Sequence, residues 1–358
     1  MPKTTLAPLR FIACLAWRTL RASLNGTAAS FHGFLRGIGT GSIRDSSNPR
    51  AGTMVVSRPR SVPIPRKKPW KLASVPFKLA RSVLQAKQAI KRSGARVVFG
   101  TGGYVSGPAY LAAKQLGLPF FVLETNALAG MANKLGVKLG GTGFNAVPNS
   151  GMAGEVVGVP VRPGVGVDPD GAKRERGLRM WNLEEARPTI LVTGGSQGAV
   201  SINAALADAV ERLTGAGFQI LHAYGRKNDA PVAHDHYTAV PYIDDMEAAY
   251  AVADVVVCRS GAMTVAENSA AGIPAIYIPL PHGNGEQGLN SAHLVDAGAA
   301  LRIDDAALSG DVLVENLLPL KDPDARATMR AALKDSGAGS VAEDLAARIA
   351  AAAGKDTK

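Results

Sequence analysis

Three short stretches of the sequence have the composition of anion-binding turns. They are GTGGYVSGP at residues 100–108, VTGGSQGAVS at residues 192–201 and CRSGAMTVAE at residues 258–267. Each follows an apolar run, and glycine lets the backbone approach an anion closely enough for N–H groups to donate. The three together predict phosphate binding, although a single such turn is as often a plain tight connection. None of them is a Walker A motif or a complete G-x-G-x-x-G, which disfavours P-loop phosphoryl transfer and nicotinamide binding.

Alternating strands and helices must position these turns. Apolar runs of strand length alternate with segments whose apolar residues recur at helical spacing. Parallel strands need crossover connections, so this order predicts two doubly wound α/β domains, with ligands beyond the carboxyl ends of the strands. The predicted strands are residues 95–99, 118–126, 189–195, 218–225, 254–261 and 273–280, and the predicted helices include residues 72–94, 107–117, 201–213, 246–253, 262–272 and 340–354.

Composition narrows the class of protein. The chain has 358 residues, of which 46% are hydrophobic, enough for two cores. No apolar run approaches the roughly 18 residues that a membrane-spanning helix needs. The run FIACLAW is followed at once by Arg18 and Arg21, which disfavours a secretory signal. Cys14 and Cys258 lie far apart without ligand spacing, so we expect a reducing compartment, no disulfide and no metal site.

Charge is distributed unevenly along the chain. Residues 1–123 hold 20 Lys and Arg and a single acid, Asp45, whereas residues 124–358 hold 20 Lys and Arg and 28 Asp and Glu. The basic front half predicts an anionic partner: nucleic acid, an acidic lipid surface or a phosphorylated substrate. Aromatic residues make up 5% of the chain and no base-stacking motif is present, which disfavours nucleic acid.

Several motifs together resemble the MurG family, the UDP-N-acetylglucosamine transferases that convert lipid I to lipid II. They are GTGGYVSGP, ETNALAGMANK, GVPVR, VTGGSQGA, YIDDMEAAYAVADVVVCRSGAMTVAENSAAGIPAIYIPLPH and EQGLNSAHL, and they span roughly residues 60–345. The resemblance implies a GT-B fold, two Rossmann-like domains with a last helix that crosses back to the first. It also implies inverting transfer without a metal or cofactor. The implied parts are an atypical segment 1–55, an acceptor domain 56–162, a linker 163–187, a UDP-GlcNAc domain 188–338 and a crossover helix 339–358.

The resemblance also implies a donor site for UDP-GlcNAc. Ser196 and Gln197 match diphosphate and sugar contacts, Glu267 matches the carboxylate that takes the ribose hydroxyls, and Gln287 matches a reader of the sugar hydroxyls. The remaining implied donor contacts are Asn126, Arg162, Ile243, Ala262, Met263 and Thr264. The residues allow plainer interpretations: Ser196 as a helix cap, Glu267 on a solvated helix face and Arg162 as a surface charge.

For the acceptor, the resemblance implies that residues of GTGGYVSGP face the diphosphate of lipid I. The matching positions are Gly102, Gly103, Tyr104 and Ser106. Lipid I lies in an anionic membrane, which gives the basic front half its partner. We therefore expect peripheral attachment at the cytoplasmic face of the cell membrane.

The sequence departs from the family at its start. The family begins with a strand and a G-G-T-x-G-H loop whose histidine is a candidate base, and nothing similar occurs in residues 1–60. His32 lacks a preceding strand and glycines. Leu123 and Thr125 stand where many relatives have histidine and glutamine. Glu124 is the nearest carboxylate and the candidate substitute base, with a structural hydrogen-bond role as the alternative.

The missing motif leaves two functions open. The first is transfer of N-acetylglucosamine to the 4-hydroxyl of the muramoyl sugar of lipid I. The alternative is a protein that binds UDP-GlcNAc without turnover. Residues 1–55 are either a misread start of an otherwise ordinary gene or part of a divergent protein that binds the donor and no longer transfers it. We expect the front sheet to lack its first strand.

Overall fold

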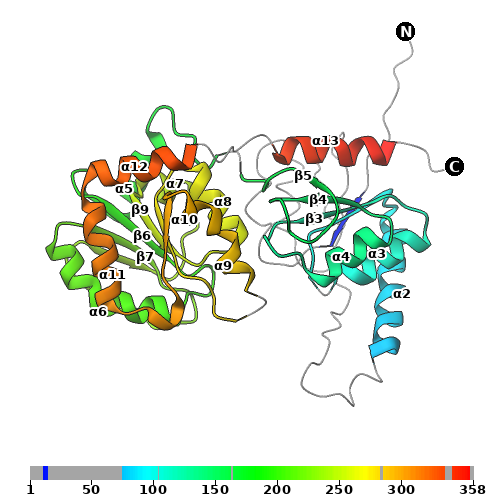
Figure 1. Ribbon diagram of the computed structural model, residues 1–358, viewed down its shortest axis with the longest axis horizontal. Helices are drawn as coiled ribbons and strands as arrows, with labels where there is room; N and C mark the ends of the chain where they lie inside the picture. Colours follow the sequence, from blue (N-terminus) through cyan, green and yellow to red (C-terminus); the bar gives the residue numbers. More distant parts are fainter. Residues whose placement is uncertain are drawn as a thin grey trace, which may run out of the picture. The chain divides into compact units, whose positions relative to one another are not determined.

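A computed structural model describes residues 11–14, 75–103, 105–162, 164–282, 285–334 and 341–354. The chain divides into two compact units, residues 1–163 with 339–358 and residues 164–338 (Figure 1). Each unit contains a sheet in which every paired strand runs parallel to its neighbour. The predicted class, two α/β domains with parallel sheets, is confirmed.

In the first unit the described strands form one sheet in the order β1-β2-β3-β4-β5. The strands are β1 (Phe11–Cys14), β2 (Val97–Gly100), β3 (Phe120–Glu124), β4 (Thr142–Asn145) and β5 (Glu155–Val156). The helices are α2 (Val75–Ser93), α3 (Ser106–Gln115), α4 (Met131–Lys138) and α13 (Val341–Gly354).

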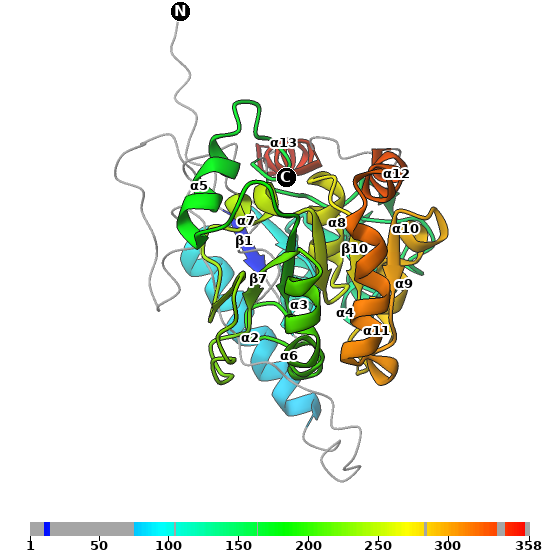
Figure 2. The same cartoon turned by 90° about the vertical axis from the view of Figure 1, so that its left-hand side faces the viewer.

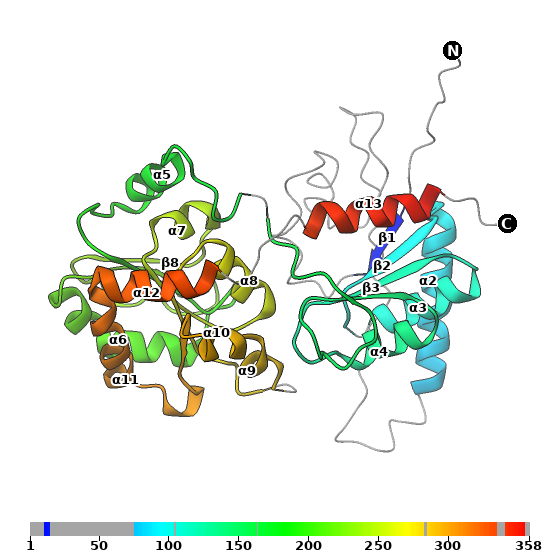
Figure 3. The same cartoon turned by 45° about the horizontal axis from the view of Figure 1, so that its top comes forward.

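Alternate residues of these strands build two cores. Val98, Phe120 and Val122 pack with α2 and α3 on one face. Val97 and Phe121 belong to the other core, which includes Leu345 and Ala353 of α13. The period of two in a strand sends neighbouring side chains to opposite faces, so both faces need a helical cover. The last helix therefore returns to the first unit and covers the face opposite α3 and α4 (Figure 3).

The prediction that the front sheet lacks its first strand is wrong. Residues Phe11–Cys14 pair with β2 in parallel, with Phe11 opposite Val97 and Cys14 opposite Gly100. This strand lies within the run FIACLAW, whose sequence gives no periodicity that predicts a strand. Four residues, among them Phe11 and Ile12 with high strand propensity, are enough for a short strand in a parallel sheet.

In the second unit the strand order is β11-β10-β9-β6-β7-β8. The chain builds outward from β6 through β7 and β8, and then crosses to β9 on the other side of β6. The point between β6 and β9 is thus a topological switch point, where ligands bind in open α/β sheets. The strands are β6 (Thr189–Thr193), β7 (Gln219–Ala223), β8 (Tyr237–Val240), β9 (Val255–Cys258), β10 (Ala275–Tyr277) and β11 (Ala300–Arg302).

Helices cover this second sheet and bury its apolar strands. A core of buried aliphatic side chains joins β6, β7, β9 and β10 to α6 and α11, which lie side by side (Figure 2). The helices are α5 (Ala172–Trp181), α6 (Val200–Gly215), α7 (Met246–Val252), α8 (Ala262–Ala270), α9 (Glu286–Asn290), α10 (Ala292–Asp296), α11 (Gly310–Leu317) and α12 (Pro323–Lys334), with short 3-10 turns at Asp305–Ala307 and Leu318–Lys321.

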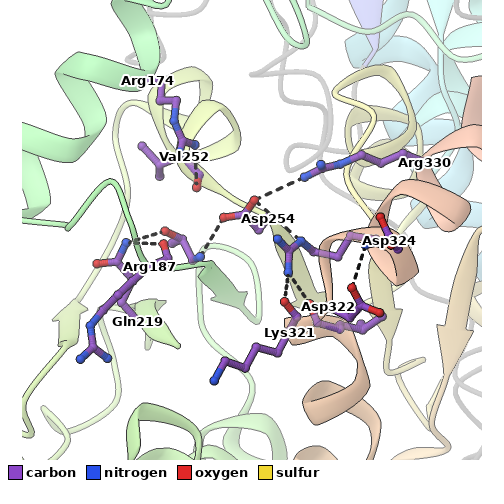
Figure 4. A network of polar contacts seen from close by, with 12 residues as sticks. Arg174, Arg187, Gln219, Val252, Asp254, Lys321, Asp322, Asp324 and Arg330 are labelled. Atoms are coloured by element: carbon purple, nitrogen blue, oxygen red, sulfur yellow. Dashed lines mark hydrogen bonds and ion pairs between the residues drawn. The ribbon is translucent and has the colours of Figure 1, made fainter. Parts of the chain in front are cut away.

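A polar network fixes the amino ends of the strands, away from the switch-point loops (Figure 4). Asp254, just before β9, accepts a hydrogen bond from the Thr189 backbone N–H at 2.9 Å. The same carboxylate pairs with Arg330 of α12 at 3.4 Å. Gln219, at the start of β7, donates through Nε2 to the Arg187 carbonyl and the Thr189 hydroxyl. The amino-terminal edge of the sheet is therefore closed by structural contacts.

None of the helices among the described residues is both long enough and apolar enough to cross a membrane.

Candidate active site

The β6–α6 loop, residues 194–199, begins at the switch point. Gly195 and Gly198 have φ of +79° and +71°, which a side chain would strain. The Gly198 N–H donates to the Gly195 carbonyl at 2.9 Å, which closes a tight turn around Ser196 and Gln197. Both residues are exposed, and their backbone N–H groups have no partner within the described part of the chain. Two adjacent N–H groups in such a glycine-rich turn are suited to binding an anion.

Ser196 is not the cap of the helix that follows. The N-cap residue of α6 is Ala199, and no side chain caps it. The capping alternative for Ser196 is thus wrong.

The β9–α8 loop, residues 259–261, lies beside the β6–α6 loop. In the register of the two strands, Thr193 at the end of β6 is paired with Cys258 at the end of β9, so both loops leave the same edge together. Gly261 is the N-cap of α8, without a side-chain cap, and Ala262, Met263 and Thr264 form the first turn. A helix N-terminus has a partial positive charge that favours a negatively charged ligand.

Glu267 lies one turn further along α8. Its side chain is only 6% exposed, and one carboxylate oxygen accepts a hydrogen bond from the Tyr250 hydroxyl at 3.0 Å. The alternative of a solvated helix face is therefore wrong. Ile243, also buried, follows the carboxyl end of β8. Both side chains follow carboxyl ends of strands of the same sheet, Glu267 after β9 and Ile243 after β8. A buried carboxylate suits a ribose contact and a buried aliphatic side chain suits a base contact.

A partly buried ionic group that sequence reasoning missed connects the β9–α8 loop to α6. The Arg259 guanidinium donates to Asp305 at 2.5 Å and to the Ser201 hydroxyl at 2.8 Å, and Ser201 donates to Asp305 at 2.7 Å. Burial alone would raise the pKa of Asp305, but the hydrogen bonds from Ser201 and Arg259 outweigh it, so this pKa lies below its usual value. An arginine directly after the apolar strand VVVC was the available signal, because such a charge must be paired.

Gln287 lies on α9, with its Oε1 accepting from the Leu280 N–H at 3.0 Å. On the same helix, Asn290 donates to the Ser260 carbonyl at 3.1 Å. The helix that carries Gln287 is thereby attached to the β9–α8 loop.

In the first unit, the turn after β2 contains Gly102 and Gly103 with φ of +97° and +84°. Ser106 is fully buried, and its hydroxyl donates to the Gly102 carbonyl at 2.6 Å. The hydroxyl thus stabilises the turn, and Ser106 is the first residue of α3. Tyr104 lies outside the described residues, as does His32.

Glu124, at the end of β3, is 2% exposed and accepts four hydrogen bonds. Oε1 accepts from the backbone and side-chain amides of Asn126, at 2.9 and 3.0 Å, and Oε2 from Gly130 N at 3.0 Å and Asn133 Nδ2 at 2.9 Å. An ionised carboxylate has about four acceptor positions, so this one has none left for a substrate proton. The geometry favours the structural role over the predicted base.

Asn133 extends the same cluster and was also missed. Its side chain accepts from the Tyr110 hydroxyl at 3.1 Å, and a Cβ at Gly102 would lie 3.0 Å from its Nδ2.

Arg162 is partly buried near the end of the first unit, so the surface-charge alternative fits it poorly. Among the described residues, no group of three or more His, Cys, Asp or Glu side chains is placed to hold a metal ion.

Comparison with known proteins identifies the family to which the chain is similar. The family model described as glycosyltransferase family 28 C-terminal domain matches residues 189–348, and that of the N-terminal domain matches residues 37–140. The UDP-N-acetylglucosamine–N-acetylmuramyl-(pentapeptide) pyrophosphoryl-undecaprenol N-acetylglucosamine transferase of Corynebacterium efficiens is 55% identical over 294 residues, covering 82% of each chain. The protein of the same name in Corynebacterium glutamicum strain R is 52% identical and covers 91% of this chain and 90% of its own. The crystal structure of MurG from Acinetobacter baumannii superposes with a TM-score of 0.64 at 28% identity, over 84% of this chain and 85% of that one.

Proposed function

This chain belongs to the MurG family of glycosyltransferase family 28, and we propose that it transfers N-acetylglucosamine from UDP-GlcNAc to lipid I in peptidoglycan synthesis. The observation that carries the proposal is the pair of loops at the switch point of the second unit. The Ser196 and Gln197 N–H groups, which have no partner among the residues that the structure describes, supply a diphosphate site together with the α8 N-terminus. The buried Glu267 supplies a ribose site at the same edge of the sheet.

The reaction is a substitution at the anomeric carbon of the sugar. The 4-hydroxyl oxygen of the muramoyl sugar forms the new glycosidic bond as the bond from that carbon to the diphosphate oxygen breaks. UDP leaves with the electron pair, and the hydroxyl proton passes to a base. Attack opposite the leaving group inverts the configuration. The amide donors of the β6–α6 loop and the α8 N-terminus stabilise the charge that develops on the departing diphosphate, which is the role a metal would otherwise serve.

Lipid I is a membrane lipid, and α2 offers a surface for peripheral attachment at the cytoplasmic face. Phe77 and Leu84 are 82% and 59% exposed. Helical spacing puts Arg81 and Lys91 on the same stripe, opposite the buried Val83 and Ile90. An apolar and basic stripe of this kind fits the interface of an anionic bilayer.

A second candidate function is donor binding without turnover. Two observations favour it: residues 1–60 contain no G-G-T-x-G-H loop, and Glu124 has its acceptor positions filled. The test is to incubate the chain with UDP-GlcNAc and a short-chain lipid I analogue, with and without excess EDTA. The proposal expects a β-linked disaccharide product, identified by its anomeric NMR coupling, at a rate that EDTA leaves unchanged. UDP-GlcNAc binding without any disaccharide would favour the second candidate.

A further inference from the structure

The β6–α6 loop is supported by a second turn, residues 224–228 with the sequence YGRKN, which we name the support turn. Gly225 has φ of +93°, and a Cβ there would lie 2.3 Å from the Gly198 nitrogen. In return, a Cβ on Gly198 would lie 2.0 Å from the Tyr224 carbonyl oxygen. The two backbones are in direct contact, so the conformation of the β6–α6 loop depends on the support turn.

Asn228 joins the two turns with both hydrogens of its side-chain amide. Its Nδ2 donates to the Gln197 carbonyl at 2.9 Å and to the Tyr224 carbonyl at 2.7 Å. A carboxamide has two such donors, whereas an aspartate of the same shape has none. Asparagine therefore satisfies two carbonyl groups that a carboxylate would repel.

The Tyr224 carbonyl is held in place by a second contact. It accepts a second hydrogen bond, from Asn203 Nδ2 at 2.9 Å, and Asn203 Oδ1 lies 3.1 Å from Nε2 of the buried His222. The chain of contacts runs from the core of the unit through Asn203 and Tyr224 to Asn228, and from there to Gln197. Asn228 thus attaches the exposed tip of the loop to the rigid sheet.

We propose that Asn228 is a positioning residue that holds the Ser196 and Gln197 N–H groups in the geometry that accepts the donor diphosphate. The inference rests on the proposed function of the β6–α6 loop. Removing Asn228 lowers the population of the competent loop, and the apparent affinity falls by the same factor. The effect is confined to the diphosphate, because Glu267 is held separately by Tyr250. The proposed base contact is also unaffected, because the variants below keep Arg226. Its guanidinium carbon lies 4.4 Å from the ring centroid of Tyr242, the residue before Ile243.

The experiment compares UDP with uridine, which lacks the diphosphate, by calorimetric titration of the full chain. In Asn228→Ala we expect the Kd for UDP to rise about tenfold, the scale of two lost hydrogen bonds, and the Kd for uridine to change less than about twofold. Asn228→Asp keeps the shape without the donors and should weaken UDP at least as much. Asp229→Ala, the exposed neighbour, is the matched control and should bind both ligands as the unaltered chain does. In transfer assays the KM for UDP-GlcNAc should rise with kcat nearly unchanged.

The results distinguish the positioning role of Asn228 from the proposed transferase function. If the unaltered chain binds UDP and Asn228→Ala binds it equally well, the positioning role is refuted while the proposed function stands. Equal losses for UDP and uridine would show a general structural role instead, which also overturns the inference. Failure of the unaltered chain to bind UDP overturns the proposed function and this inference with it.

Discussion

The two glycine-rich loops, β6–α6 in the second unit and β2–α3 in the first, resemble each other in sequence and differ in what their polar groups do. In the β6–α6 loop, Ser196 and Gln197 are exposed and their N–H groups are unpartnered within the described residues. In the β2–α3 loop, the Ser106 hydroxyl is buried and donates to the loop itself. The β6–α6 loop therefore has backbone donors that we propose bind the diphosphate, whereas the Ser106 hydroxyl stabilises the turn after β2.

The same contrast extends to the carboxylates. Glu267 near the first loop accepts a hydrogen bond from the Tyr250 hydroxyl, and we propose that it binds a ribose, whereas Glu124 near the second accepts four hydrogen bonds from its own segment. The proposed donor site is therefore supported by the geometry of the second unit. For the acceptor side, the relatives supply most of the interpretation.

Among the variants considered, we expect Glu267→Ala to change donor recognition most. Two charge-assisted hydrogen bonds to the ribose hydroxyls, at about 2 kcal/mol each, predict a rise in the KM for UDP-GlcNAc of about a thousandfold. Tyr250→Phe keeps the carboxylate and should change KM by less than about tenfold. Glu315→Ala, an exposed glutamate of α11, is the control in steady-state kinetics. A Glu267→Ala enzyme with a normal KM would remove the ribose role.

Glu124 should behave in the opposite way. Glu124→Ala leaves four donors unsatisfied and should lower the free energy of unfolding by about 3–4 kcal/mol, measured by denaturant titration. Glu124→Gln, which turns an amide toward donors, should lose about half of that. If Glu124→Gln were instead fully stable and devoid of transfer activity, the base role predicted from the sequence would be restored.

His222 makes the support of the β6–α6 loop sensitive to acid. Burial lowers the pKa of His222 to about 4, whereas the unfolded chain has its ordinary value near 6.5. The unfolded state binds the extra proton between these values, so stability is full above pH 6.5 and falls by roughly 3 kcal/mol as the pH drops to 4. Thermal melting from pH 7 to 4 should show a smaller loss in His222→Gln. An identical pH profile in the variant would exclude His222 as the cause.

The smallest effect concerns α2 in the first unit. Arg81→Ala should reduce partitioning onto vesicles with 30% anionic lipid by about fivefold, the scale of one basic residue near a charged surface, or about 1 kcal/mol. Arg302→Ala, in the second unit, should have no effect in the same sedimentation assay. Equal losses for the two variants would mean that the interaction is not localised on α2.

Prediction from sequence succeeded where apolar runs were long and glycines marked their ends. The strands at Thr189–Thr193 and Val255–Cys258 and the helix at Val341–Gly354 lie within the predicted ranges. The strands β4, β5, β8 and β11 were missed, because TGFN, EV, YTAV and ALR are too short or too polar to show a period. Strand β1 was misjudged for the same reason.

For the site, residues inside recognised motifs could be named, but their partners could not. The contacts of Arg259 with Asp305 and of Asn228 with Gln197 join segments 46 and 31 residues apart in the chain. No spacing rule in a single sequence predicts such pairs. The four donors to Glu124 lie within nine residues of it, yet they depend on the turn that the segment adopts.

Whether this chain transfers N-acetylglucosamine is measured in a single reaction that contains the chain, radiolabelled UDP-GlcNAc and a short-chain lipid I analogue. The fraction of label in the lipid product is measured beside a sample without acceptor. We expect the amount of labelled lipid II analogue to be well above that of the sample without acceptor, and to be lost in Glu267→Ala. Folded chain that binds UDP-GlcNAc and yields no labelled lipid would contradict the claim that this protein is a working transferase.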